Sequence, residues 1–180
     1  MTNTLEALEQ TQFLTFLLAD ESYAISILRV REIIEYETVT RVPNMPASIR
    51  GVINLRGAVV PVVDMGLRFG MREIRVTKRT CVIIVEVEAN GERLVMGLMA
   101  DAVSQVIDLP PADIEPPPAF GTRVRVDFLK GLGKIGKRFV LILDLERALS
   151  SAELLAAASA QDLVLPPAGD LAQAALVPAN

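Results

Sequence analysis

The sequence has no histidine and no tryptophan, and it contains a single cysteine, Cys81. The absence of histidine excludes Ser-His-Asp and Cys-His catalytic arrangements and every metal site that needs a histidine ligand. One cysteine can form neither an internal disulfide nor a cysteine-rich zinc site, so the chain fits a reducing compartment. We therefore expect neither a bound metal nor a cofactor.

The chain is also poor in basic residues and in long apolar runs. Its 180 residues contain 18 Lys and Arg against 22 Asp and Glu, which gives a net charge of −4. Nucleic-acid-binding domains usually present a basic face, so the composition argues against such a partner. A membrane-spanning helix needs about 20 apolar residues, and the longest fully apolar runs are far shorter. The N-terminus lacks the features of a signal peptide, and we expect a soluble, cytoplasmic protein.

Half of the residues are hydrophobic (51%), which indicates a folded chain, and they form mostly short, strand-like runs. These runs occupy residues 13–18, 23–27, 49–55, 58–63, 81–87, 94–99, 103–107, 124–132 and 138–143. The spacing at 27–34 is helical, and short helices are expected at 65–69 and 145–149, where Asp64 and Asp144 are suitable N-caps. An Ala- and Leu-rich segment predicts a helix at the C-terminus.

The pattern occurs twice along the chain. Ala24 and Val30 correspond to Gly97 and Val103, 73 residues later, whereas Gly51 and Asp64 correspond to Gly131 and Asp144, 80 residues later. A period this long excludes a solenoid and indicates two duplicated subdomains, each a small barrel of about five strands. The expected organisation of this mainly β chain is an N-terminal tail at 1–11, a barrel with a basic linker at 12–79, a second barrel at 80–149, a helix at 150–165 and a flexible Ala/Pro-rich tail at 166–180.

Three features could carry chemistry, and each has a plainer explanation. Residues 131–138 (GLGKIGKR) differ by one position from the phosphate-binding motif GxxxxGK[ST], but Arg138 replaces the hydroxyl residue and a strand pattern follows, which favours a hairpin turn. Asp64 and Asp144 could form a catalytic pair, although N-capping explains both better. Cys81 opens an apolar strand and is interpreted as a buried structural thiol.

Two further residues are candidates for binding another protein. Arg56 lies beside Gly57 at a tight turn between apolar strands, where its guanidinium could form a bidentate contact with a partner's carboxylate. A solvated turn residue is the alternative. Phe120 follows three prolines and is either a lid on the core or an anchor in an interface.

Several motifs, in order and at compatible spacing, resemble the CheW family of chemotaxis coupling proteins. They are FLTF (13–16), YAISILRVREII (23–34), VPNMP (42–46), IRGVINLRGAVVPVVD (49–64), VSQVI (103–107), FLKGLG (128–133) and LILDL (141–145). The resemblance spans about residues 12–149. It implies two packed five-stranded β-barrels, in agreement with the duplication, and an adaptor without enzymatic activity.

The resemblance also implies partners and site residues. Such adaptors bind the cytoplasmic tip of a methyl-accepting chemoreceptor, in the groove between the subdomains, and the regulatory domain of the histidine kinase CheA. Both interactions, together with contacts to other copies of the adaptor, would hold the protein in membrane-associated arrays. The receptor-contact positions fall on Val30, Glu32, Gly51 and Arg56, with Asn54 and Gly57 shaping the turn, and Phe120 falls on the kinase or ring interface. Glu115 departs from the basic residue expected in that lateral contact.

Two other functions stay open on the sequence alone. The same module could serve another chemosensory pathway, such as twitching motility. A nucleotide-binding enzyme could instead use the loop Gly131–Lys137.

Overall fold

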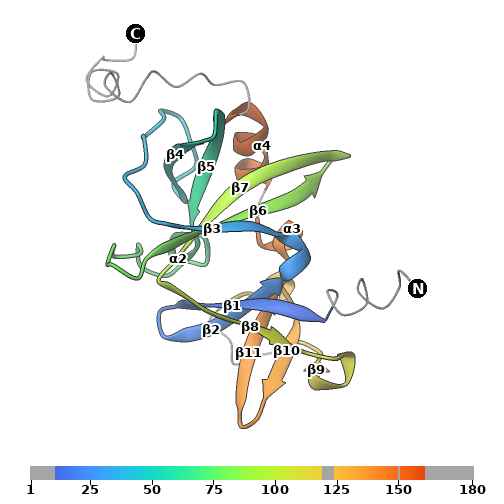
Figure 1. The fold of residues 1–180 in the computed structure, drawn as a ribbon. Coiled ribbons are helices and arrows are strands. Elements are labelled where there is room, and N and C mark those ends of the chain that lie inside the picture. The colour runs from blue at the N-terminus through green and yellow to red at the C-terminus, as the bar shows by residue number, and fades with distance from the viewer. Residues whose placement is uncertain (1–10, 119–123, 150, 161–180) are drawn as a thin grey trace.

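The computed structural model describes residues 11–118, 124–149 and 151–160. Within these residues the chain forms two β-sheets, several short helices and one longer helix near the C-terminus (Figure 1). The mainly β architecture expected from the sequence is therefore confirmed. The expected tails lie outside the described residues, apart from Thr11.

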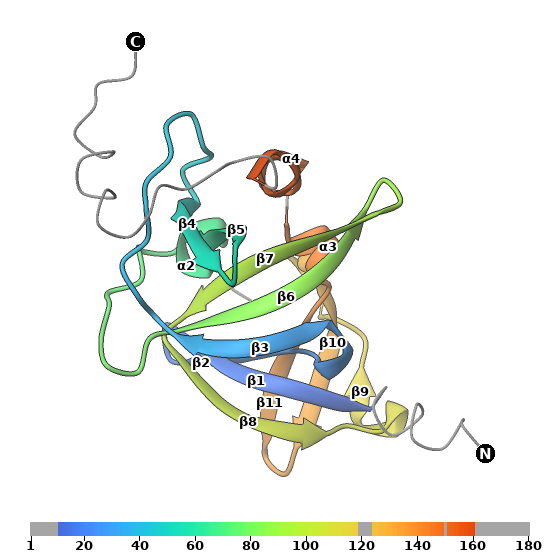
Figure 2. The same cartoon turned by 45° about the horizontal axis from the view of Figure 1, so that its top comes forward.

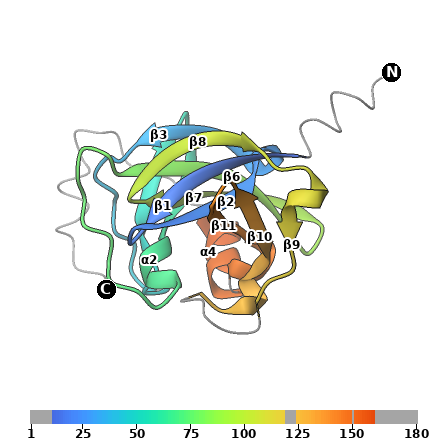
Figure 3. The same cartoon turned by 90° about the horizontal axis from the view of Figure 1, so that it is seen from below.

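Sheet A has six strands, in the spatial order β8 (Ala102–Asp108), β1 (Gln12–Leu18), β2 (Glu21–Ser26), β11 (Arg138–Leu143), β10 (Leu129–Ile135) and β9 (Ile114–Glu115). Sheet B has five, in the order β3 (Val30–Glu35), β6 (Cys81–Ala89), β7 (Glu92–Ala100), β5 (Ala58–Asp64) and β4 (Ile49–Leu55). Both sheets curve strongly, so that each forms part of a barrel (Figures 2 and 3).

Each sheet takes a hairpin from the other half of the chain. The hairpin β1–β2 lies in sheet A between β8 and β11, and the hairpin β6–β7 lies in sheet B between β3 and β5. The boundary expected at residues 79–80 therefore does not separate the two sheets. Strand pairing decides which sheet each strand joins. The third strand of each half pairs with the hairpin of the other half, so β3 pairs with β6 and β8 pairs with β1.

Two parallel strand pairs show the same register in both halves. Val62 lies opposite Gly97 in the pair β5–β7, and Ile142 lies opposite Ala24 in the pair β11–β2. These positions are related by the same offsets of 80 and 73 residues that the sequence shows. The repeat in the sequence is thus also a repeat in strand pairing.

A row of aromatic rings crosses the core between the sheets. The ring centroids of Phe16, Tyr23, Phe69 and Phe128 follow one another at 6.0, 5.9 and 5.9 Å. Phe16 and Tyr23 belong to sheet A, whereas Phe69 follows helix α2 (Met65–Arg68), which begins at the end of β5 in sheet B. Because aromatic side chains bury large apolar areas, this row joins the two sheets into one core.

Asp64 and Asp144 are the N-caps that the sequence predicts. The carboxylate of Asp64 accepts a hydrogen bond from the Leu67 N–H at 3.1 Å and begins α2, and that of Asp144 accepts one from the Arg147 N–H at 3.3 Å and begins α3 (Leu145–Ala148). Asp64 is completely buried, and its other oxygen lies 3.0 Å from both the Arg50 guanidinium and the Ile74 N–H. A buried carboxylate needs such partners. Asp64 and Asp144 therefore both have structural roles.

The C-terminal helix α4 (Ser151–Ala160) lies on β5 and β7 (Figure 2). Its Glu153 is 4% exposed, accepts a hydrogen bond from the Ser48 hydroxyl at 2.5 Å and lies 3.6 Å from the Arg68 guanidinium. Ala160, at the end of the helix, packs with Val52 and Val59 of the hairpin β4–β5. The helix therefore covers the outer face of this hairpin.

Two segments differ from the sequence prediction. Residues 27–34, expected at helical spacing, form a 3₁₀ turn at Ile27–Arg29 followed by strand β3, because β3 pairs along β6. The strand expected at 124–132 begins only at Leu129, after a 3₁₀ turn at Val126–Phe128, and extends to Ile135 because it pairs with β11 up to Arg138.

The turns of the two exchanged hairpins suggest a stabilising change. Ala19 and Asp20 both have positive φ angles (48° and 69°), whereas the equivalent turn in β6–β7 uses Asn90 and Gly91, which suit this conformation. A left-handed conformation costs an ordinary residue roughly 1–2 kcal/mol. We expect Ala19→Asn with Asp20→Gly to raise the free energy of unfolding by about 1 kcal/mol in urea titrations. The reverse exchange, Asn90→Ala with Gly91→Asp, should lower the free energy of unfolding. An unchanged urea midpoint in both variants would show that the turn at Ala19 and Asp20 is not strained.

Candidate functional site

The candidate site is the two-residue turn between β4 and β5. Arg56 and Gly57 form this turn with φ angles of +51° and +88°, and the Asn54 side-chain oxygen accepts a hydrogen bond from the Gly57 N–H at 2.8 Å. Because both central residues have positive φ, the turn matches the twist of the flanking strands and holds Arg56 at its tip. Asn54 and Gly57 thus shape the turn, as the sequence predicts.

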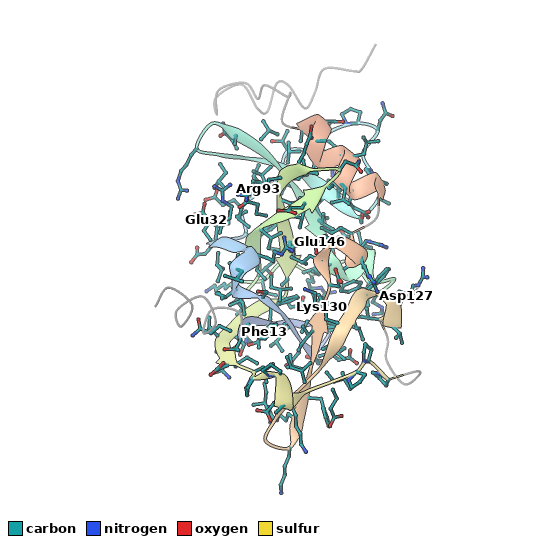
Figure 4. The ribbon with its side chains drawn as sticks, turned by 90° about the vertical axis from the view of Figure 1, so that its right-hand side faces the viewer. Phe13, Glu32, Arg93, Asp127, Lys130 and Glu146 are labelled. Carbon is teal, nitrogen blue, oxygen red and sulfur yellow. The ribbon has the colours of Figure 1, made fainter. Side chains whose placement is uncertain are left out.

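The Arg56 side chain makes a bidentate ion pair with Glu32 of β3, the strand at the opposite edge of sheet B. Its two terminal nitrogens lie 2.9 and 3.0 Å from the two carboxylate oxygens. Arg56 is 79% exposed and Glu32 25% exposed, so the pair sits at the surface of sheet B, where Figure 4 shows Glu32. The sequence did not predict Glu32 as the partner of Arg56, because Arg56 was expected to bind a carboxylate of another protein.

A surface hollow of about 690 Å³ lies beside the ion pair. Its polar rim contains Arg31, Glu32 and Arg56, and its apolar lining comes from strands β4 to β7. The apolar lining residues are Leu55, Ala58, Val59, Val60, Ile84 and Val95. Sequence reasoning missed Ile84 and Val95, since their place beside Arg56 depends on the exchanged hairpin β6–β7.

Val30 and Gly51 occupy different positions from the turn. Val30 is half-buried against the main core, two residues from Glu32 on β3. Gly51 is buried, and a Cβ atom there would meet the Thr40 carbonyl oxygen of the strand bridge that Thr40 makes with Val52. The structure therefore brings four of the six expected receptor-contact residues together at the surface, whereas Gly51 permits a close approach of two backbone segments.

The other candidates for chemistry do not form a catalytic centre in the described residues. Residues 131–138 form the end of β10, a turn at Gly136 and the start of β11, with no helix N-terminus facing the glycines, so the phosphate-loop hypothesis is wrong. Cys81 is only partly buried, and its thiol lies 3.2 Å from the Arg79 carbonyl oxygen. Within the residues that the structure describes, no three Cys, Asp or Glu side chains form a cluster that could hold a metal ion.

The lateral contact expected at Phe120 lies outside the described residues. Glu115 is described, and it is exposed on the short strand β9, opposite Leu132 of β10. Among the residues with a described position, no helix is both long and apolar enough to cross a membrane.

Comparison with known proteins assigns this chain to a family. A family model described as the CheW-like domain matches residues 12–153. The chain belongs to the CheW-like family. Membership makes it a scaffolding and coupling protein of chemotaxis, an adaptor without catalytic activity.

Individual CheW proteins are similar over most of their length. The chemotaxis protein CheW of Klebsiella aerogenes is 40% identical over 143 residues, which cover 79% of this chain and 84% of that protein. A probable chemotaxis protein CheW of Rhizobium etli is 35% identical over 146 residues, covering 81% and 92%. The crystal structure of the scaffolding protein TtCheW from Thermoanaerobacter tengcongensis superposes with a TM-score of 0.67 at 35% identity, covering 76% of this chain and 85% of that one.

The position of Gly51 predicts a structural effect that its repeat partner should share. A Cβ at Gly51 or at Gly131 would lie 2.4 or 2.6 Å from a backbone oxygen, of Thr40 or Glu115 respectively. We expect Gly51→Ala and Gly131→Ala each to lower the free energy of unfolding by about 1–3 kcal/mol, measured by urea denaturation. Ala58→Gly, an exposed change on the same hairpin, is the control. Gly51→Ala with unaltered stability would instead point to a role in binding alone.

Proposed function

We propose that this adaptor couples methyl-accepting chemoreceptors to the histidine kinase CheA, and that the Arg56 turn is its receptor-binding element. The observation that carries the proposal is the ion pair between Arg56 and Glu32 at the rim of an exposed hollow that combines polar groups with apolar side chains. Neither partner of this pair supports the core. A bidentate guanidinium–carboxylate pair fixes both side chains in defined positions before a partner arrives.

The hollow fits one face of a partner helix. Apolar side chains of a receptor helix would contact Leu55, Ile84 and Val95, and polar groups at the edge of that helix would contact Arg56 and Glu32. A bound helix would remove water from the pair, which strengthens charged hydrogen bonds at the edge of an apolar contact. Val30 lies two residues from Glu32 on β3, so it would support this strand.

The kinase domain would bind elsewhere, so that the adaptor can hold both partners at once. Phe120 is the expected contact with the kinase or with other copies of the adaptor. Attachment to receptors through such contacts would place the protein in the cytoplasm at membrane-associated arrays. The receptor that binds decides which chemosensory pathway it serves, whether chemotaxis or a related system such as twitching motility.

Reversal of the charge at position 56 tests the receptor site. We expect Arg56→Glu to weaken binding to a receptor signalling fragment by at least about tenfold, equal to about 1.4 kcal/mol, because Glu would repel Glu32 and remove the guanidinium donors. The free energy of unfolding should change by less than about 1 kcal/mol, since exposed ion pairs contribute little. The measurements are calorimetric binding and urea denaturation.

Arg93→Glu is the matched control for this variant. Arg93 is 74% exposed, lies on β7 and is within 4.0 Å of Glu88, so its reversal changes the net charge equally at a different hairpin. Its receptor affinity should stay near that of the unmodified chain. Equal affinities for both variants would place the receptor site away from the Arg56 turn.

A further inference from the structure

The C-terminal end of helix α4 lies beside the hollow at the Arg56 turn. Ala160, the last residue of α4, is completely buried and packs with Val52 and Val59 of the hairpin β4–β5. Val59 also lines the hollow. A strand advances about 3.4 Å per residue, so Gly57 in the turn comes only about 7 Å before Val59. Helix α4 therefore ends close to the rim of the hollow.

The residues that follow α4 in the sequence are close enough to reach this hollow. Residues 161–165 (QDLVL) come directly after the helix. An extended segment of this length spans roughly 17 Å, which exceeds the length of strand between α4 and the turn. Pro166 favours an extended backbone for the residue before it, and an extended segment would place Leu163 and Leu165 on the same side.

The hollow has the size and the lining for two leucine side chains. Its volume of about 690 Å³ lies in the range of pockets that enclose a small ligand. Large apolar side chains in its lining come from Leu55, Val60, Ile84 and Val95. Leucine side chains that enter the hollow would remove their own surface and that of the lining from water, which stabilises the contact.

The charges of the hollow and of the C-terminal segment are complementary. Arg31, on the rim of the hollow, is exposed and forms no ion pair with another described residue. Residues 161–180 contain two acidic residues, Asp162 and Asp170, and no basic residue. Asp162 directly precedes Leu163, so its carboxylate would meet the Arg31 guanidinium at the rim while the leucine enters the hollow.

A second groove near α4 is a poorer match for this segment. It has a volume of about 420 Å³ and lies between α4 and the loop 42–46, and Leu155, 69% exposed, is part of its lining. None of the lining residues is charged, so the groove offers no partner for Asp162. This α4 groove is the alternative binding place for the segment.

We propose that residues 162–165 bind in the hollow in the free adaptor and compete there with the receptor, an inference that rests on the proposed receptor site. The apolar part of the segment contacts the lining, Asp162 pairs with Arg31, and the ion pair between Arg56 and Glu32 stays intact. Because the segment is attached to α4, its effective concentration at the hollow is high even when the contact itself is weak. A receptor helix must then bind more strongly than the segment, which excludes helices that fit the hollow poorly.

Engineered cysteines test the contact within the full chain and without a receptor. In a Cys81→Ser background, which contains no other cysteine, Val164→Cys is combined either with Ala58→Cys at the hollow or with Leu155→Cys at the α4 groove. Each chain is mildly oxidised at low protein concentration. The disulfide to position 58 should form at least about tenfold faster, because binding in the hollow raises the effective concentration of the two thiols. Equal rates would overturn the proposal, and a faster disulfide to position 155 would overturn it in favour of the α4 groove.

Reversal of single charges tests the ion pair between the segment and the rim. Arg31→Glu and Asp162→Lys should each slow the disulfide to position 58 by about threefold or more, and the two changes together should restore the rate. Arg93→Glu, an exposed reversal at another hairpin, is the control and should leave the rate unchanged. A double variant that stays slow would overturn this placement of the segment.

Receptor affinity, measured by calorimetry, tests the competition. Leu163→Ser with Leu165→Ser should raise the affinity for a receptor signalling fragment by about three- to tenfold, as expected when the segment occupies the hollow in about 70–90% of the free molecules. Leu171→Ser with Leu176→Ser makes the same chemical change later in the chain and should leave the affinity unchanged. An affinity that stays the same in the first variant would overturn the competition. If Arg56→Glu also bound the receptor normally, the receptor site itself would lie elsewhere, so the two failures are distinguishable.

Discussion

Both sheets depend on strand pairs between the two halves of the chain. The hairpin β1–β2 completes sheet A, and the hairpin β6–β7 completes sheet B. Without this exchange, β3 would lose its pairing with β6 and β8 its pairing with β1. Because these pairs connect residues far apart in sequence, the chain must close long loops before either sheet is complete. The aromatic row from Phe16 to Phe128 then packs between sheets that are already joined by strand pairing.

The candidate site uses the rigidity that this pairing provides. Arg56 lies at the tip of a hairpin whose outer face is covered by α4 and whose strand β5 pairs with β7 of the second half. Glu32 comes from the opposite edge of the same sheet, so the ion pair reaches across the ends of β3 and β4. A binding site held on paired strands keeps its geometry when a partner arrives, which suits an adaptor that has no reaction to perform.

Local features of the structure follow from the sequence, whereas its long-range pairing does not. Most of the strands, both N-caps and the turn at Arg56-Gly57 are set by neighbouring residues and could be predicted. The exchange of hairpins could not be predicted. The alternation of apolar residues in β1 and β6 is compatible with pairing to the third strand of either half. Residues 27–34 have helical spacing in the sequence for a similar reason. Val30 and Ile34 suit both a helix and a strand, and the pairing with β6 decides for the strand. The pairing of Glu32 with Arg56 and the lining by Ile84 and Val95 also depend on this exchange.

The linker at 71–79 follows the helix that Asp64 begins, and Ile74 within it is held by Asp64 and Arg50. The role of this linker becomes clear if the chain is considered cut within it. Each half would then be a separate polypeptide that lends its first hairpin to the other, which is the arrangement of a domain-swapped homodimer. Joining the two halves in one chain makes the partner permanent. It also lets the two halves carry different residues, so that one hairpin is covered and bears the Arg56–Glu32 ion pair, whereas the other exposes Phe139.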